Sequence, residues 1–318
     1  MLKMQLRPRW KLDAEKDPMM NQRLYGLALA ALIPLCTCSK GQAEVKIEED
    51  VTYRTVDGQD LQLDIATPEG DGPFPAILFI HGGGWHQGSR DGYRGQIEHA
   101  AQRGYVAATI SYRLMQFDIA KKETTTAEPR FPAQVHDAKA AVRWLRANAD
   151  QHKIDTKRIG VTGGSAGGYL SLMVGLTDPS AKLEGEGPNA ELSSRVDAVV
   201  NVFGPTHFAS GYNDSSVPWI LRLFMGGEPD EVPETYELAS PVKYVSSDDP
   251  PVLTLHGDQD ALVPVQQAKL LDERMKAAGA EHELIVLEGQ GHGFKGDAQK
   301  LADEAMWRFF EDHLKPAG

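Results

Sequence analysis

The chain has 318 residues, of which 41% are hydrophobic and 25% charged, the composition of an ordinary globular protein. Its 33 basic and 45 acidic residues give a formal net charge of −12. This balance excludes nucleic acid and anionic membrane surfaces as partners, because both require a basic patch. A chain of this length commonly folds as one domain when it forms an α/β sheet.

The N-terminus has the features of an export signal. Arg23 precedes an almost wholly apolar run, Leu24–Cys36, and small and polar residues follow as far as Ala43. A basic start, a short apolar run and an exit through small residues predict a signal peptide over residues 1–43. The apolar run is 13 residues long, whereas a helix needs about 20 to span a bilayer.

Two alternatives to a cleaved signal peptide stay open. The segment is also compatible with a lipoprotein leader, in which Cys38 carries a lipid anchor, and with a buried first helix of the domain. Met20 is an alternative start of the chain. Either kind of leader implies an exported protein, periplasmic or secreted, with a mature domain over residues 44–318.

The domain opens with a predicted hairpin and a buried strand. Val51–Val56 and Leu61–Ala66 are joined by Asp57-Gly58, a dipeptide typical of hairpin turns. The next segment, Ala76–Ile80, is entirely apolar, which predicts a strand buried in the middle of a sheet.

A glycine-rich loop, His81-Gly82-Gly83-Gly84-Trp85, follows this strand. Consecutive glycines leave their backbone N–H groups unshielded, which suits an oxyanion hole for a tetrahedral intermediate. We expect Gly83 and Gly84 to supply these donors, and His81 to brace the loop through a hydrogen bond of its ring. Trp85 is a candidate for the wall of a substrate pocket, with packing in the core as the alternative.

Helices and strands alternate along the rest of the chain. This alternation predicts a mainly parallel sheet with helices on both faces, and the hairpin would add antiparallel strands at one edge. The predicted helices are Tyr93–Arg103, Ala133–Asn148, Gln266–Ala278 and Ala298–His313, and the predicted strands are Tyr105–Ile110, Lys157–Thr162, Val196–Val202, Val252–Leu255 and Glu283–Leu287.

Ser165 lies in a Gly-x-Ser-x-Gly frame with Gly163 and Gly167. A serine at a sharp turn between a strand and a helix needs small neighbours, because the backbone there is strained and crowded. The turn lifts the hydroxyl to a position that a base can reach, so Ser165 is the candidate nucleophile. The N–H of Ala166, the next residue, is then a further oxyanion donor.

A nucleophilic serine requires a base to take its proton, and the base requires a carboxylate to orient it. His292, in a glycine-rich loop after the last predicted strand, is the candidate base. Asp260, beyond the strand before it, is the candidate acid. Asp258 is the rival, although we expect it to bond backbone N–H groups of the turn. Asp248 and Asp249 precede that strand and therefore lie at the wrong end of the sheet.

Residues 205–250 interrupt the alternation and are rich in proline, glycine and aromatic side chains. We expect this insertion to cover a substrate cleft, with Trp219 and Phe224 as candidate pocket residues. Simple packing of these aromatics within the insertion is the alternative. A second, polar loop over residues 116–130 is expected to flank the same cleft.

The four motifs HGGGW, GGSAGG, HGDQDALVP and GQGHGF together resemble those of the α/β-hydrolase superfamily. Within it the chain is similar to the feruloyl-esterase/acetylxylan-esterase and hormone-sensitive-lipase-like groups, over roughly residues 50–315. Hormone-sensitive-lipase-like enzymes carry Asp where this chain has Gly164, and they begin with a helical cap rather than a hairpin. These differences favour the feruloyl-esterase-like branch and an open cleft.

The resemblance implies an α/β-hydrolase fold and a serine carboxylesterase that forms an acyl-enzyme on Ser165. Its implied substrates are short-acyl or hydroxycinnamoyl esters of plant polysaccharide. No cofactor is implied, and the pair His81 and His86 has no spacing that would hold a metal. The alternatives are a prolyl-oligopeptidase-like serine peptidase, which would normally carry a large N-terminal propeller, and a non-catalytic binding protein, which would lack a member of the triad.

Overall fold

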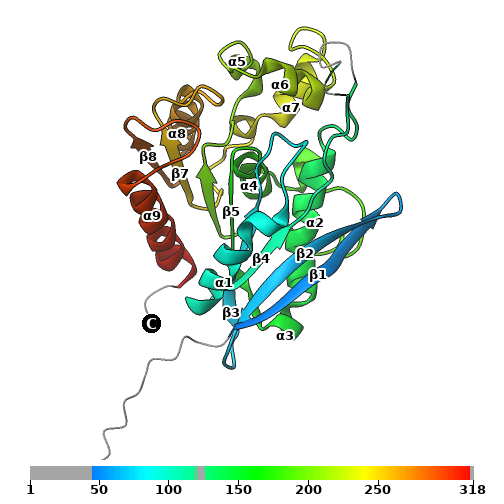
Figure 1. Cartoon of the computed structure of the whole chain (residues 1–318), viewed down its shortest axis with the longest axis vertical. Helices are drawn as coiled ribbons and strands as arrows, with labels where there is room; N and C mark the ends of the chain where they lie inside the picture. Colours follow the sequence, from blue (N-terminus) through cyan, green and yellow to red (C-terminus); the bar gives the residue numbers. More distant parts are fainter. Residues whose placement is uncertain (1–44, 119, 121–125, 316–318) are drawn as a thin grey trace, which may run out of the picture. The chain divides into compact units, whose positions relative to one another are not determined.

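The computed structural model describes residues 45–118, 120 and 126–315 (Figure 1). The predictions for the leader, including its Cys38 anchor and Met20 start, lie outside the described residues.

One sheet of eight strands forms the centre of the described structure, in the order β1-β2-β4-β3-β5-β6-β7-β8. β1 pairs antiparallel with β2, and β2 with β4, whereas all the other neighbours are parallel. The predicted α/β-hydrolase fold, with its hairpin at one edge, is confirmed. The strands are β1 (Val45–Val56), β2 (Gln59–Pro68), β3 (Phe74–Ile80), β4 (Val106–Ile110), β5 (Ile154–Gly164), β6 (Ala198–Val202), β7 (Val252–Gly257) and β8 (His282–Leu287).

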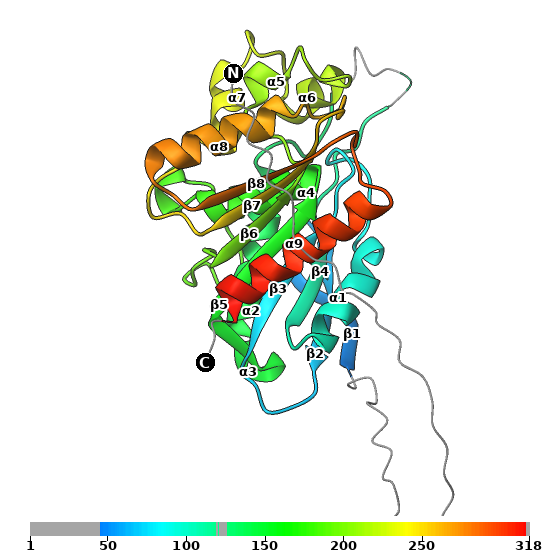
Figure 2. The same cartoon turned by 90° about the vertical axis from the view of Figure 1, so that its left-hand side faces the viewer.

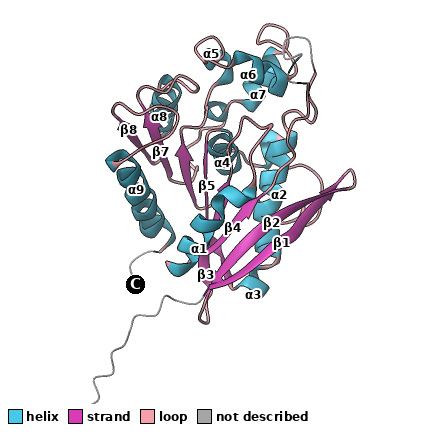
Figure 3. Cartoon of the chain, in the orientation of Figure 1, coloured by secondary structure: helices cyan, strands magenta, loops and turns pink. Residues whose placement is uncertain are grey.

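Helices cover both faces of this sheet, and Figure 3 shows the strands as a layer between them. α1 and α9 pack on one face, where they share a core with Ile77 and Phe79 of β3. α2 and α4 lie on the other face (Figure 2). They pack there against Leu78 of the same strand, as the alternating direction of side chains along a strand requires. The helices are α1 (Arg94–Gln102), α2 (Ala133–Ala147), α3 (Ala149–His152), α4 (Ala166–Leu176), α5 (Phe208–Gly211), α6 (Pro218–Met225), α7 (Pro233–Ala239), α8 (Gln266–Ala278) and α9 (Asp297–Leu314).

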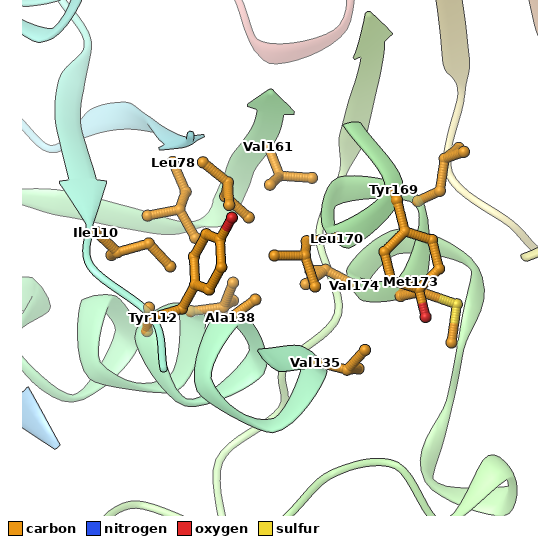
Figure 4. Close-up of a cluster of buried hydrophobic side chains, with 14 of the residues drawn as sticks. Leu78, Ile110, Tyr112, Val135, Ala138, Val161, Tyr169, Leu170, Met173 and Val174 are labelled. Atoms are coloured by element: carbon orange, nitrogen blue, oxygen red, sulfur yellow. The ribbon is translucent and has the colours of Figure 1, made fainter. Parts of the chain in front are cut away.

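The helix that follows the nucleophile candidate, α4, is buried at every position. It lies between the sheet and α2, so it has no face toward water and needs no polar stripe. Figure 4 shows Leu170 and Val174 of α4 among side chains from β3, β4, β5 and α2. This packing holds the N-terminus of α4 firmly against the end of β5.

Two predicted segments differ from the structure in detail. The predicted helix Tyr93–Arg103 corresponds to α1, which begins at Arg94 after a 3₁₀ turn over Arg90–Tyr93. The side chain of Ser89 caps this turn by accepting the N–H of Asp91. The insertion at 205–250 is not irregular throughout, since it contains α5, α6 and α7. A proline stands in the first turn of both α6 and α7, where its missing N–H costs no helical hydrogen bond.

The parallel arrangement brings several loops to one edge of the sheet. The loops after β3, β5, β7 and β8 all leave from the carboxyl ends of their strands, where ligands bind in open α/β sheets. The helices of the insertion gather at the same end (Figure 1).

Candidate active site

Ser165 occupies a strained turn between β5 and α4, with φ 57° and ψ −120°. Its N–H donates to the carbonyl of Val202, 2.9 Å away, which ties the turn to the end of β6. A Cβ added to Gly163 or Gly167 would lie 2.3 or 2.0 Å from the carbonyl oxygen of Ile80. Glycine is therefore a steric requirement on both sides of the serine.

The structure brings the three candidate catalytic side chains together in one chain of hydrogen bonds. The hydroxyl of Ser165 lies 2.8 Å from Nε2 of His292, and Nδ1 of His292 lies 2.7 Å from Oδ2 of Asp260. The other oxygen of Asp260 accepts the N–H groups of Leu262 and Val263, each at 2.9 Å. With Nδ1 donating to the carboxylate, Nε2 is free to accept the serine proton.

The carboxyl group of Asp260 has no exposed surface, and its environment keeps it ionised. Burial by itself raises the pKa of Asp260, but hydrogen bonds from His256, His292 and the N–H of Val263 outweigh it. The pKa is therefore held well below its usual value. The imidazole of His292 thus faces a full negative charge on the side away from the serine.

The glycine-rich loop after β3 reaches the same place. Gly83 and Gly84 have positive φ values of 113° and 57°, and a Cβ on Gly83 would lie 2.1 Å from the carbonyl oxygen of Gln87. The N–H of Ala166 is the first of α4, so no helical carbonyl can accept it. Within the described part of the chain, the N–H groups of Gly83, Gly84 and Ala166 have no protein acceptor, and all three residues line the pocket beside Ser165.

His81 braces this loop in the way that its position predicted. Its Nδ1 donates to the carbonyl of Gly82 at 2.7 Å, and its ring stacks on Tyr112 with centroids 4.3 Å apart. Burial lowers the pKa of His81, which favours the neutral ring. His81 is therefore a structural residue of the loop.

A mostly apolar cavity of about 530 Å³ opens above Ser165. This volume falls within the usual range for small-molecule sites. Its lining includes the candidate Trp85 and the unpredicted Phe203, whose ring lies 4.6 Å from that of His292. Other apolar walls come from the insertion and from the loop after β7: Phe208, Val217, Ile220, Leu221, Leu262 and Val263.

The two aromatic candidates of the insertion do not line this cavity. Phe224 is fully buried behind Trp85, with ring centroids 4.0 Å apart. Trp219 packs near Phe117 and His86, at centroid distances of 6.0 and 6.4 Å. The apolar side chains that the insertion contributes to the pocket include Phe208 and the aliphatic Val217, Ile220 and Leu221.

The rival carboxylates have other partners. Oδ1 of Asp258 accepts the N–H of Gly289 at 2.7 Å, and so joins the loops after β7 and β8. Asp249 accepts from the backbone and hydroxyl of Ser246, ahead of β7. Asp260 alone of these contacts His292.

Neither a metal site nor a membrane span is found in the described residues. Over 45–118, 120 and 126–315, no group of three or more His, Cys, Asp or Glu side chains could hold a metal ion. No helix within those same ranges is both long and apolar enough to cross a bilayer.

A mainly parallel sheet, a strained serine turn and a serine–histidine–aspartate chain at the carboxyl ends of the strands define the class of the α/β-hydrolases. The similarity to known proteins agrees with this class. The chain belongs to the BD-FAE family, whose model matches residues 63–275.

Relatives and solved structures extend the comparison. The chain is 34% identical to esterase LipC of Mycobacterium tuberculosis over 70% of its own length, but spans only 53% of that protein. The structure of esterase 2 of Thermogutta terrifontis matches with a TM-score of 0.68 and 30% identity, covering 88% of this chain and 96% of that one. A truncated carbohydrate esterase from gut microbiota matches with a TM-score of 0.69 and 28% identity, and the match covers 85% of this chain and 98% of that one.

Proposed function

We propose that the protein is a serine carboxylesterase that hydrolyses carboxylic esters through an acyl-enzyme on Ser165. The observation that carries the proposal is the hydrogen-bonded chain from Ser165 through His292 to Asp260 at the floor of an apolar pocket. This is the arrangement that nucleophilic catalysis by a serine requires.

In the acylation half of the reaction, Oγ of Ser165 attacks the ester carbonyl carbon while Nε2 of His292 takes the hydroxyl proton. The tetrahedral intermediate then collapses, the bond to the alcohol oxygen breaks, and His292 gives its proton to the departing alcohol. Asp260 keeps the imidazole in the required tautomer and stabilises the imidazolium that forms between these transfers.

In the deacylation half, a water molecule takes the place of the alcohol. His292 removes a proton from this water as its oxygen attacks the acyl carbon. The bond between the acyl carbon and Oγ of Ser165 then breaks, and His292 gives the proton to Oγ. The products are the carboxylic acid and the free enzyme. Both halves pass through an oxyanion.

We assign the oxyanion hole to the N–H groups of Gly83, Gly84 and Ala166. The support for this assignment is that these groups have no acceptor among the described residues and belong to residues that line the pocket beside Ser165. Each well-placed donor of this kind contributes about 3–4 kcal/mol to the stability of a transition state.

The proposed substrates are short-acyl or hydroxycinnamoyl esters, including those on plant polysaccharide. The cavity of about 530 Å³ with apolar walls favours a compact apolar acyl group. The similar structure from gut microbiota is a carbohydrate esterase, which supports a sugar as the alcohol. Such a substrate lies outside the cytoplasm, in keeping with the proposed export signal over residues 1–43 and the alternative lipid anchor at Cys38.

The test is a panel of p-nitrophenyl acetate and butyrate, methyl ferulate, acetylated xylan and a peptide amide, with wild type and Ser165→Ala. We expect hydrolysis of the esters, and a loss of at least about a thousandfold in the variant. Cleavage of the peptide amide in preference to the esters would support the peptidase alternative. Wild-type protein without hydrolytic activity would support a binding protein.

A further inference from the structure

A second histidine, His256, lies beside the carboxylate of Asp260 and takes no part in the chemistry above. It is the penultimate residue of β7, and its side chain has no exposed surface. Its Nε2 lies 2.8 Å from the carbonyl oxygen of Val263 and 3.4 Å from Oδ2 of Asp260. Both neighbours are acceptors, so the geometry places the ring hydrogen on Nε2.

The other nitrogen of the ring supports this tautomer. Nδ1 of His256 is buried and has no hydrogen-bond partner among the described residues. A hydrogen on Nδ1 would leave a buried donor unsatisfied, which is more costly than an unused acceptor lone pair. His256 therefore presents one fixed donor, directed at the loop that carries Asp260.

This donor closes a ring of contacts around Asp260. Val263 gives its N–H to Oδ1 of Asp260 and accepts the ring N–H of His256 through its carbonyl group. Oδ2 of Asp260 lies between Nδ1 of His292 at 2.7 Å and Nε2 of His256 at 3.4 Å. The carboxylate is thus oriented by the turn on one oxygen and by two imidazoles on the other.

We propose that His256 is a positioning residue, which holds the carboxylate of Asp260 in the orientation that His292 requires. The inference rests on the proposed function, because it acts through the Ser165 reaction. His256 touches neither the ester nor Ser165. We expect its effect on the rate of the proton transfers and not on the binding of substrate, because the side chain of His256 does not line the pocket.

His282 provides a matched control on the neighbouring strand. It is also a buried histidine bonded to a carboxylate, with Nδ1 2.9 Å from Asp272 and Nε2 2.9 Å from the hydroxyl of Thr254. It stands at the first residue of β8, which is the opposite end of the sheet from the active-site loops. Replacing it removes a similar buried interaction without touching Asp260.

The test compares His256→Met, His256→Gln and His282→Met, with active sites counted by titration with an organophosphate that labels Ser165. We expect His256→Met to lower kcat per titrated site about tenfold, with KM within about twofold of wild type. His256→Gln, whose amide can place an N–H near the position of Nε2, should recover part of the loss. His282→Met should lower the melting temperature but leave kcat per site unchanged.

A double-mutant cycle with Asp260→Asn separates positioning from general damage. If His256 acts through Asp260, His256→Met should cost less than about twofold in the Asp260→Asn background. The inference would be overturned if His256→Met kept the kcat of wild type, or if it lowered kcat by the same factor in the wild-type and Asp260→Asn proteins. If His256→Met gives no titratable protein, the same comparison is made with His256→Gln. Failure of the proposed function is seen separately, as activity that survives Ser165→Ala.

Discussion

The indole of Trp85 stacks on the ring of Phe224, with centroids 4.0 Å apart and planes only 4° from parallel. Trp85 belongs to the glycine-rich loop that supplies the proposed oxyanion donors, and Phe224 belongs to α6 of the insertion. Both are buried, at 3% and 0% exposure. The stack therefore joins the oxyanion loop to the helix that lines the substrate pocket.

Phe224→Ala should destabilise the protein by about 3–5 kcal/mol, because it removes a fully buried aromatic ring and leaves a cavity behind Trp85. Denaturation by urea measures the loss. The control is Leu301→Ala, a residue 47% exposed, for which the expected change is within about 0.5 kcal/mol. Equal stability of the two variants would show that the stack contributes little.

Gly167→Ala should lower activity by about a hundredfold or more by displacing the serine turn, since its Cβ would lie 2.0 Å from the carbonyl oxygen of Ile80. Backbone atoms cannot yield as the end of a flexible side chain can, so the turn itself has to move. A shift of about 1 Å in a nucleophile costs on the order of a hundredfold in rate. Gly92→Ala is the matched control, because nothing lies within 4 Å of its added Cβ. The assay is ester hydrolysis per milligram of folded protein, and an active Gly167→Ala enzyme would contradict the prediction.

Asp260→Asn should lower kcat by about three to four orders of magnitude, because an amide can hold His292 in the wrong tautomer. The pKa of Asp260 is held well below its usual value, so this carboxylate stays ionised from pH 5 upward. Protonation of Asp260 should therefore make no contribution to the wild-type pH–rate profile above pH 5. An acid limb above that pH that is steeper than one proton would contradict this assignment.

Asp258→Asn is the companion variant. Its amide oxygen can still accept the N–H of Gly289, so the expected loss is about tenfold at most. If Asp258→Asn instead lost as much activity as Asp260→Asn, the roles of the two carboxylates would have to be exchanged.

Asp64→Asn should make the protein less stable at pH 7 by about 3 kcal/mol, because it breaks a buried ion pair. The carboxylate of Asp64 has no exposed surface and accepts from Arg90 at 2.9 Å and Arg94 at 2.7 Å. Burial raises its pKa, but the N–H of Asp50 and the two arginines lower it further, so the net shift is downward.

Because the carboxyl of Asp64 has a lower pKa in the folded protein than in the unfolded chain, its ionised form stabilises the folded state at pH values above the pKa of the unfolded chain. This stabilisation is lost as the pH falls through the pKa of the folded protein. The free energy of unfolding of wild type should therefore decline below about pH 4, and Asp64→Asn should decline less steeply. Asp214→Asn, at an exposed position, should follow the wild-type curve. Parallel curves for wild type and Asp64→Asn would contradict the assignment.

The fold class and the order of the site motifs could be predicted from the amino-acid sequence alone. Alternating apolar segments predicted the parallel sheet, because the periodicity of burial follows directly from strand and helix geometry. Ser165 could be predicted as the candidate nucleophile because its turn excludes bulky neighbours. This local constraint is visible in the sequence as Gly163 and Gly167. His292 and Asp260 were recognisable because each follows a strand whose end must lie at the same edge of the sheet.

Which side chains surround that site could not be predicted in this way, because it depends on the packing of the folded chain. Phe224 and Ile220 belong to the same helix, yet one is buried behind Trp85 and the other lines the cavity. Phe203 comes to lie beside His292 only because β6 and the loop after β8 end near each other. His256 likewise reaches Asp260 through the fold of one short loop. Such contacts depend on how distant segments pack, and packing is set by shape in three dimensions and not by local pattern.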